Sequence, residues 1–475
     1  MKRVLRKSSC RVKNAALLVA SALLASVLSV SVLGEEPYSV DFSSQVGAIK
    51  ALNGVNLWSK FSRATLEDGQ AAAEACHFST VRLHDAPWDN EGMRLVDVHQ
   101  IFGNLSADPS DPANYFFKAT DDYIANIIKS GAIPVYRLGT SIEHTANKYF
   151  AKKPTDMAHY AEICAGIVRH YTEGWADGYH WDMYWEIWNE PNLVPQMWDD
   201  EDWNSYCKFY ETVARRLRSE FPNIKIGGPA LTHADRNLLK WFAGHCHEAQ
   251  VPLDFVSWHC YAHTPSEVLD PPFEIRKILD EAGYPNAELH LNEWHYFPTQ
   301  WNVVHGENGG WEAKRELGTS PEGLHGAEAA AFVEYVLTRW QDGPLDMSNY
   351  YAYGLDTWGL HDIVGKPRAT YYAFLLFGEL ITNAPLRVST SVATEHVSLL
   401  GATDASGQKR YLLVSAYKEA EEQELEIKLS GVQPNGHAKV SRIDYDVDLA
   451  ESEVEYKDGV LKLHAQKSSV FLVRF

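Results

Sequence analysis

Between about residue 48 and residue 382, eight short β-rich runs alternate with segments whose apolar residues recur near helical spacing. A strand followed by a helix, repeated along a chain, is typical of parallel βα units, and eight such strands are the number that closes a barrel. The pattern therefore predicts an α/β fold of the (β/α)8 TIM-barrel type. The predicted strands are Leu52–Leu57, Thr80–His84, Ile133–Leu138, Met183–Asn189, Ile224–Gly227, Phe255–His259, Glu288–Asn292 and Ser348–Tyr353. The predicted helices are Tyr123–Ser130, Met157–Tyr171, Asp202–Glu220, Arg236–Glu248, Glu274–Ala282 and Ala327–Trp340.

From about Leu386 the helical patterns stop, and short alternating runs with Gly and Asn turns take their place. This pattern predicts a C-terminal β-sandwich domain. Its predicted strands are Arg410–Ala416, Glu424–Leu429, Ala438–Asp444 and Ser469–Phe475. The expected organisation is a signal peptide at residues 1–34, a catalytic barrel domain at residues 35–384 and the accessory β-sandwich domain at residues 385–475.

The first 14 residues carry six basic side chains and no acidic one, and the apolar run Ala15–Leu33 follows them. This is the order of a secretory signal peptide, and it predicts a secreted or periplasmic protein. The run is also long enough to span a bilayer as an uncleaved anchor. In both cases the catalytic part would face outward, and we expect no other contact with a membrane.

The chain is acidic, with a net charge of −20, and loss of residues 1–34 would make it more negative by six. Such a surface repels nucleic acid at long range, so we expect no nucleic-acid partner. A locally basic cleft would still be compatible with an anionic sugar. The 45% hydrophobic and 22% charged residues are ordinary for a soluble globular protein.

Five cysteines lie outside the signal-like segment, and none of them forms a C-x-x-C pair. An odd number without that spacing argues against a disulfide framework or a zinc site, and buried thiols are the expected state. His245-Cys246-His247 resembles a metal-binding tract, but it falls on a predicted helix away from the strand ends. We therefore expect no metal and no cofactor.

Two glutamates end apolar runs about a hundred residues apart, in Asn189-Glu190-Pro191 and in Asn292-Glu293-Trp294. Barrel enzymes place their chemistry at the C-terminal ends of the strands, where these residues fall. A pair of carboxyl groups, one to protonate a leaving oxygen and one to attack, is what a glycosidase requires.

Other polar residues are predicted at the same strand ends: Arg82, His84 and Asp85 after the second strand, and His259 and Tyr261 at the sixth. Each has an alternative interpretation. A lone histidine such as His259 is often a satisfied core residue, and Arg82 is also suited to be a structural counter-ion. The coincidence of polar residues at four strand ends favours a functional site.

Several motifs, taken in order and spacing, resemble glycoside hydrolase family 39, which groups β-xylosidases, some β-glucosidases and α-L-iduronidases in the clan of retaining (β/α)8 glycosidases. The likeness covers roughly residues 45–382. The motifs are Val81–His84, Trp185-Glu-Ile-Trp-Asn-Glu-Pro-Asn-Leu193, Ile226–Ala230, Asp254–Tyr261, Asn292–Trp294, Lys366-Pro367 and Tyr371–Phe374.

Carried over to this chain, the resemblance implies that Glu190 is the acid/base and Glu293 the nucleophile, and that Asn189 holds the 2-hydroxyl of the glycone. The remaining expected substrate-binding residues are Arg82, His84, His259, Tyr261 and Trp294, and Tyr261 is expected to hydrogen-bond Glu293. Two departures stand out. Asn292 precedes the nucleophile where the family commonly has threonine, and the eighth strand reads Ser348-Asn349-Tyr350-Tyr351 where the family often has a tryptophan.

The predicted function is a retaining glycoside hydrolase, exo-acting on β-xylosides or related neutral β-glycosides through a glycosyl-enzyme intermediate. Alternatives are an α-L-iduronidase-like or endo-acting enzyme of the same clan, a carbohydrate-binding pseudo-enzyme, and an anchored structural protein of the cell surface. The partner is expected to be a glycoside or an oligosaccharide. The sequence leaves the sugar, the linkage and the oligomeric state open.

Two long connections, Asp85–Phe116 and Tyr296–His325, are expected to shape the cleft, because long loops in compact domains tend to be functional. Their rings would either stack on sugars or pack beneath the loops. These rings belong to Trp88, Tyr115, Trp301 and Trp311.

Overall fold

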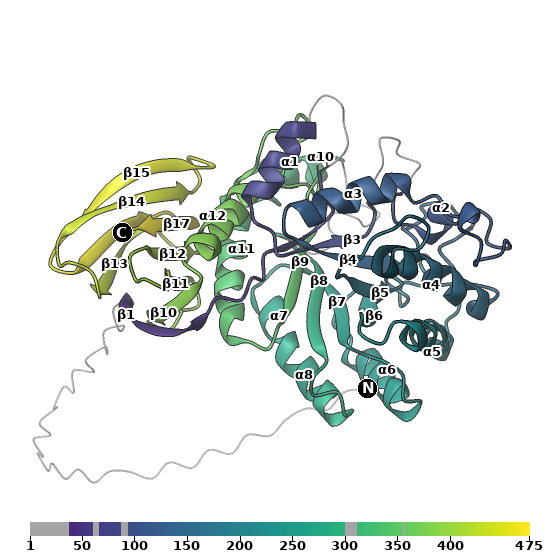
Figure 1. The fold of residues 1–475 in the computed structure, drawn as a ribbon. Helices are drawn as coiled ribbons and strands as arrows, with labels where there is room; N and C mark the ends of the chain where they lie inside the picture. Colours follow the sequence, from purple (N-terminus) through teal and green to yellow (C-terminus); the bar gives the residue numbers. More distant parts are fainter. Residues whose placement is uncertain (1–37, 60–65, 87–93, 300–310, 355–356) are drawn as a thin grey trace, which may run out of the picture. The chain divides into compact units, whose positions relative to one another are not determined.

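The computed structural model describes residues 38–475 except 60–65, 87–93, 300–310 and 355–356 (Figure 1). The signal-like residues 1–34 lie outside the described residues. Among the described residues, no helix combines the length and apolar character needed to cross a bilayer.

The predicted barrel is confirmed. Eight parallel strands form a closed ring, and the last of them, β9, pairs with the first, β2. Their bounds are β2 Gly54–Asn56, β3 Thr80–Leu83, β4 Ile133–Leu138, β5 Tyr184–Ile187, β6 Lys225–Leu231, β7 Phe255–Ala262, β8 Glu288–Tyr296 and β9 Met347–Tyr350. The strands are buried almost throughout, as expected for strands that face side chains on the inside and helices on the outside.

Helices follow the strands and surround the ring (Figure 1). Their bounds are α1 Leu66–Ala75, α2 Val98–Ile101, α3 Lys118–Lys129, α4 Met157–Glu173, α5 Trp203–Glu220, α6 Arg236–Glu248, α7 Ser266–Leu269, α8 Pro271–Glu281, α10 Trp311–Thr319, α11 Ala327–Arg339 and α12 Ala369–Asn383. Local signals fix several starts. Asp156, Asp202 and Asp235 each precede a helix and accept a hydrogen bond from a backbone N–H of its first turn.

The C-terminal strands form a nine-stranded sheet in the order β15-β14-β17-β12-β11-β10-β1-β13-β16. It is antiparallel except for the pair β1–β13. Its two edge strands, β15 and β16, also contact each other, so the sheet curves around a hydrophobic core of its own. The nine strands are β1 Tyr38–Ala48, β10 Leu386–Thr390, β11 Val397–Thr403, β12 Arg410–Ala416, β13 Gln423–Ser430, β14 Gly436–Ile443, β15 Ala450–Tyr456, β16 Val460–Ala465 and β17 Ser469–Arg474.

The structure differs from the predicted domain organisation in one element. Strand β1 falls within residues 35–384, which the sequence assigns to the barrel, but it pairs with β10 and β13 in the C-terminal sheet. Its partners lie more than 300 residues along the chain, so no local pattern reveals the pairing. The predicted sandwich strands all lie in this sheet, whose strands enclose a hydrophobic core of their own.

Helices α11 and α12 lie between the barrel and this sheet (Figure 1). α11 is buried along nearly its whole length and contacts β8 on one side and β11, β12 and β17 on the other. An ion pair adds to the contact: both N–H groups of the Arg474 guanidinium fork meet the Glu379 carboxylate of α12 at 2.6 Å. The barrel and the sheet are thus packed together through one shared helical layer.

Candidate active site

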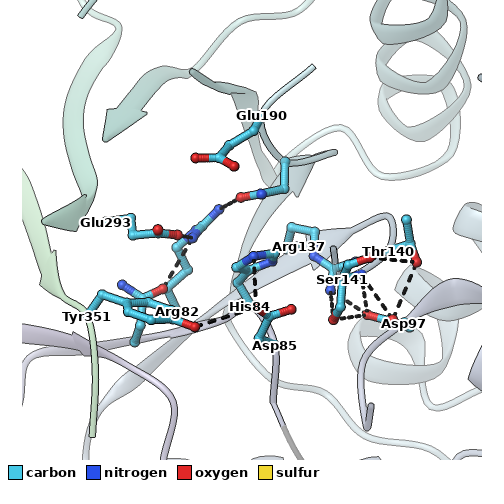
Figure 2. A network of polar contacts seen from close by, with 12 residues as sticks. Arg82, His84, Asp85, Asp97, Arg137, Thr140, Ser141, Glu190, Glu293 and Tyr351 are labelled. Carbon is cyan, nitrogen blue, oxygen red and sulfur yellow. Dashed lines mark hydrogen bonds and ion pairs between the residues drawn. The ribbon is translucent and has the colours of Figure 1, made fainter. Parts of the chain in front are cut away.

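The predicted site residues, apart from Trp294, meet at the C-terminal ends of the barrel strands. Glu293 lies on β8, Glu190 follows β5, and the side chain of Arg82 on β3 lies below and between the two carboxyl groups (Figure 2). After β5 the chain turns sharply, with positive φ at Trp188 and Glu190, and the Glu190 N–H donates to the Ala230 carbonyl at 2.9 Å. The turn fixes the Glu190 backbone above the barrel.

Glu293 is almost fully buried, with 6% of its surface exposed, and three neighbours contact its carboxylate. Arg82 Nη1 lies 3.0 Å from Oε2, and the Tyr261 hydroxyl donates to Oε1 at 2.8 Å, as predicted. His259 Nδ1 lies 3.7 Å from Oε1. Burial raises the pKa of Glu293 above its ordinary value, while His259, Arg82 and the Tyr261 hydrogen bond act in the opposite direction.

Arg82 is fully buried, and its guanidinium is shared among protein acceptors. Besides Glu293, it donates from Nε to Glu186 Oε2 at 2.8 Å, from Nη2 to Asn189 Oδ1 at 2.7 Å and from Nη1 to Asn56 Oδ1 at 3.2 Å. The pKa of Arg82 is raised, since Glu186 and Glu293 outweigh the effect of burial. Arg82 therefore acts as the counter-ion that orients Glu293 and Asn189, which leaves little of it for a substrate.

Glu190 has a different environment from Glu293. Its Oε1 lies 2.9 Å from His259 Nδ1, and none of the arginine contacts found among the described residues reaches it. Burial raises the pKa of Glu190 to about 7; Arg82 lowers it somewhat, and Asp85 raises it further. Burial lowers the pKa of His259 to about 4, so this ring is neutral near pH 7. Near pH 7, Glu190 is thus suited to hold a proton, whereas Arg82 stabilises the charged form of Glu293.

The two carboxyl groups are close together. Glu190, His259 and Glu293 each offer one polar atom, and these three atoms lie within 4.8 Å of one another. Such a cluster has the composition of a cation site, and these are the residues that would hold a metal. However, Arg82 already supplies the positive charge at Glu293, which disfavours a second cation there.

His84 and Asp85 lie beside Arg82 on the floor of the site (Figure 2). His84 Nε2 is 3.6 Å from Asp85 Oδ2, and the Tyr351 hydroxyl donates to the same oxygen at 3.4 Å. Burial, followed by Arg82 and Arg137, lowers the pKa of His84 well below its usual range, so its ring is neutral. His84 Nδ1 has no hydrogen-bond partner within the described part of the chain. His84 thus contributes a buried, neutral ring to the floor of the site.

Trp294 is a correction to the predicted site. It is fully buried and packs edge-on against Trp340 and Tyr350, at centroid distances of 5.0 and 4.9 Å. After Glu293 the side chains alternate, so Trp294 faces the helices and not the barrel mouth. Before Glu293 the register with β7 shifts, and Asn292 also points inward. Trp294 is therefore a packing residue.

The aromatic residues expected on the two long loops are only partly described. Tyr115 is buried and packs on Phe102, Phe117 and Trp175, so it supports its loop and does not line the cleft. Trp88 and Trp301 lie outside the described residues, and so does the side chain of Trp311.

Sequence reasoning missed Glu186, which lies on β5 and is fully buried. It accepts hydrogen bonds from Arg82, from the Ser257 hydroxyl at 2.7 Å and from the Asn292 amide. A charged residue within an apolar strand requires a partner, and this signal was present in Trp185-Glu186-Ile187. Asn56, by contrast, carries no signal in the sequence.

The remaining motif, His245-Cys246-His247, lies on α6 and not at the strand ends. His245 Nε2 pairs with Glu211 at 3.2 Å on the outer helices, and Cys246 is buried. The five cysteines at 76, 164, 207, 246 and 260 are all free thiols, as the sequence predicted.

Comparison with known proteins agrees with this geometry. The family model described as glycosyl hydrolases family 39 matches residues 56–281, the part of the barrel that contains Glu190. This part of the chain is thus similar to family 39. The match ends before Glu293, whose assignment therefore rests on its motif and its position in the site.

Two curated relatives of this chain are named β-xylosidase. The one from Geobacillus stearothermophilus is 28% identical over 170 residues, which are 32% of this chain and 34% of the relative. The one from Caldicellulosiruptor saccharolyticus is 26% identical over 270 residues, or 51% of this chain and 52% of the relative. The chain thus spans about a third to a half of the length of these relatives.

Among solved structures, a glucosidase from Croceicoccus marinus has a TM-score of 0.74 at 21% identity, covering 92% of this chain and 98% of that one. At this identity the likeness concerns the fold alone. It extends over both the barrel and the C-terminal sheet.

The two departures from the usual family 39 pattern have structural consequences. Asn292, in the place of the common threonine, uses its amide to bind the buried Glu186. At the eighth strand, Tyr350 turns outward and packs on Trp294, whereas Tyr351 lies in the site next to Asp85 (Figure 2). Tyr351, directly after β9, is therefore the aromatic residue that this end of the strand brings to the site.

Proposed function

We propose that this protein is a retaining glycoside hydrolase that removes terminal β-xylosyl units, or related neutral β-glycosyl units, from its substrate. The observation that carries the proposal is the pair Glu190 and Glu293, held within 4.8 Å of a common histidine and in unequal environments. Retaining enzymes hold their carboxyl groups about 5–5.5 Å apart, and inverting enzymes about 6.5–9.5 Å apart. The short spacing supports attack by Glu293 itself instead of attack by a water.

In the first step Glu190 gives its proton to the glycosidic oxygen as the bond from that oxygen to the anomeric carbon breaks. A carboxylate oxygen of Glu293 forms the new bond to this carbon, which gives a glycosyl-enzyme joined through an ester bond. Arg82 and Tyr261 hold Glu293 in place and stabilise its ionised form before the attack.

In the second step water attacks the anomeric carbon, and the Glu190 carboxylate takes up a proton from it. The bond to Glu293 breaks, and both carboxyl groups return to their starting states. The charges of Glu190 and Glu293 repel each other, so esterification of Glu293 lowers the pKa of Glu190 and converts it from an acid into a base. One residue thus serves both steps.

The sugar is inferred from the relatives named β-xylosidase and from the neutral histidines beside the carboxyl pair. Arg82 contacts Glu293 of the pair, and four of its five N–H donors are taken by protein acceptors. An α-L-iduronide, which carries a carboxylate, would therefore find little of this buried arginine to bind. A panel of aryl β-xyloside, β-glucoside, α-arabinoside and α-iduronide tests the choice, with the β-xyloside expected to turn over fastest.

The mechanism is tested by trapping the enzyme with a 2-fluoro-β-xylosyl fluoride and mapping the labelled peptide. The expected label is on Glu293, and Glu293→Gln should neither turn over nor become labelled. A label on another carboxylate would refute the assignment. NMR of the first product should show retained anomeric configuration, and an inverted product would refute double displacement.

We also propose that residues 1–34 direct export, on the basis of their basic and then apolar character. N-terminal sequencing of the protein recovered outside the cytoplasm tests this. A mature chain that starts near Glu35 is expected, whereas retention of the enzyme in the cytoplasm would contradict it.

A further inference from the structure

Strand β8 contains one extra residue immediately before Glu293. In the register of β8 with β7, Leu291 pairs with Trp258, whereas the next residue of β7, His259, pairs with Glu293. Asn292 is left over between these two pairs. Such an insertion is a β-bulge, which bends the strand locally and redirects the side chains that follow it.

The register with β9, on the other side of β8, contains the same extra residue. Leu291 pairs with Ser348 and Trp294 pairs with Tyr350, so three steps along β8 match two steps along β9. Because both neighbouring strands skip one residue, the irregularity belongs to β8 itself. The bulge thus lies in the strand that carries the proposed nucleophile.

The bulge determines the direction in which Glu293 points. His290 faces the barrel interior, where its ring lies 5.3 Å from that of Tyr184 on β5, a strand that is not a neighbour of β8 in the ring. Regular alternation would turn Glu293, three positions later, towards the helices. Instead, Asn292 and Glu293 both face inward, and Trp294 faces the helical layer. One inserted residue has therefore moved Glu293 from the outer face to the barrel mouth.

Two buried side chains hold the bulged residue. The Asn292 amide donates to Glu186 Oε1 on β5, and the Asn292 carbonyl accepts from Asn56 Nδ2 on β2 at 2.9 Å. All three residues are fully buried. A bulge interrupts the ladder of strand hydrogen bonds, so its polar groups require partners elsewhere. Asn56 and Glu186 supply them from the barrel interior.

Glu186 connects the bulge to the counter-ion of Glu293. Glu186 Oε2 lies 2.8 Å from Arg82 Nε, and Arg82 Nη1 lies 3.0 Å from Glu293 Oε2 (Figure 2). The Ser257 hydroxyl of β7 donates to Glu186 Oε1 at 2.7 Å and fixes this carboxylate from another side. Because Asn292 and Glu293 are adjacent in the chain, the contacts close into a ring that contains the proposed nucleophile.

The amide of Asn292 is well suited to this contact. Its nitrogen is one carbon further from the backbone than the hydroxyl of the threonine that is common at this position in family 39. It donates to a charged acceptor, and hydrogen bonds to charged groups are stronger than those between neutral groups. The residue in which this chain departs from the family is thus the one that anchors the bulge.

We propose that Asn292 and Glu186 are positioning residues for the nucleophile: their contact holds the bulge, and the bulge aims Glu293 at the anomeric carbon. The inference rests on the proposed glycosidase function and specifies it further, because it names the residues that set the direction of attack. Both act through Glu293 and not through the substrate. Attack requires aligned atoms, and a misplacement of about 1 Å costs on the order of 10²-fold in rate.

The test measures the attack of Glu293 directly, as the first-order rate constant for inactivation by a 2-fluoro-β-xylosyl fluoride. Asn292→Ala should lower this constant about 100-fold, whereas the dissociation constant of the reagent should stay nearly the same. Asn53→Ala is the matched control. Asn53 is also fully buried, but it precedes β2 at the other end of the barrel and donates to the His77 carbonyl at 3.0 Å, so its loss should leave the inactivation constant nearly unchanged.

A second measurement removes the group that is positioned. In Glu293→Ala, azide should attack a dinitrophenyl xyloside in place of the carboxylate and give a glycosyl azide of inverted configuration. Adding Asn292→Ala should then cause little further loss, because azide is not attached to the bulge. A further loss as large as in the native background would indicate a general structural role and would overturn the proposal.

Crystal structures provide a readout that does not depend on turnover. In Asn292→Ala the Glu293 carboxylate should move away from Arg82, and Asn292→Thr, with its shorter donor, should give an intermediate inactivation constant and serves if the alanine variant does not fold. An unmoved Glu293 with an unchanged constant would contradict the proposal. If the native enzyme neither turns over glycosides nor becomes labelled, but Glu293 leaves Arg82 in the variant, the role of the bulge stands and the proposed hydrolysis fails.

Discussion

At the scale of single residues, the site separates two identical side chains by their surroundings. Glu293 has an arginine and a tyrosine hydroxyl on its carboxylate, whereas Glu190 has a neutral histidine. The first set of contacts favours a charge, and the second tolerates a proton. In the proposed mechanism, an acid and a nucleophile are obtained from the same amino acid in this way.

Glu190→Ala should therefore slow substrates according to their leaving groups. Xylobiose, whose departing oxygen needs a proton, should lose roughly 10²–10⁴-fold in kcat, whereas a dinitrophenyl xyloside should lose far less in the first step. Added azide should restore turnover and yield a glycosyl azide of retained configuration, because it attacks the intermediate without a base. Equal losses on both substrates without azide rescue would contradict the role of Glu190.

The dependence of kcat/KM on pH should also reflect the different surroundings of the two carboxyl groups. Burial raises the pKa of Glu190, the proposed acid, to about 7, so kcat/KM for xylobiose should fall as the pH rises through that value. On the acid side it should fall as Glu293 becomes protonated. The two limits belong to the coupled pair rather than to separate residues. The dinitrophenyl xyloside serves as the control and should keep its rate to higher pH.

At the scale of elements, the alternation of strand β8 decides which neighbours of Glu293 belong to the site. Glu293 points into the mouth, and Trp294 points to the helical layer, where it meets Trp340 and Phe332. Trp294→Ala should therefore lower the free energy of unfolding by about 3–5 kcal/mol, as for other buried aromatic side chains, and leave KM nearly unchanged.

Urea unfolding and steady-state kinetics on the same preparation check this. Glu293→Gln is the complementary control, since it should abolish turnover with little loss of stability. A large rise in KM for Trp294→Ala at unchanged stability would return this residue to the substrate site.

These elements also explain what the sequence could reveal. Strands β2–β9 were predictable because each is a short apolar run between helical patterns, and Glu190 and Glu293 because their motifs lie at strand ends. The outward direction of Trp294 was available from the period of two in a strand. The pairing of β1 with β10 and β13 was not, because a strand pattern does not identify a partner hundreds of residues away. Nor does any local pattern place Asn56 next to Arg82.

At the scale of the whole molecule, α11 joins the barrel to the C-terminal sheet. It is apolar on nearly every face, as expected for a helix enclosed on all sides. The Ser415 hydroxyl of β12 donates to the Ala331 carbonyl of this helix at 2.7 Å. Without the sheet, the outer face of α11 would be exposed to water, so the barrel depends on the C-terminal strands for its stability.

This helical layer contains one ionisable side chain whose burial is unfavourable. Glu334 of α11 is fully buried, and neither carboxyl oxygen has a hydrogen-bond partner among the described residues. Burial raises the pKa of Glu334 well above its ordinary value. The native state therefore keeps a proton that the unfolded chain releases, and stability falls as the pH rises from the unfolded pKa towards the folded one.

Glu334→Gln should remove this dependence, since the amide is similar in shape and does not titrate. One retained proton corresponds to a slope of about 1.4 kcal/mol per pH unit, so the variant should gain stability over the native chain as the pH rises above the pKa of an ordinary glutamate. Urea unfolding at several pH values measures the difference. Glu328→Gln, on the same helix, is the matched control: Glu328 pairs with Lys418 at 3.0 Å, so its loss should lower stability at pH 8. A constant difference between Glu334→Gln and the native chain at all pH values would show that Glu334 is not the proton that the folded state retains.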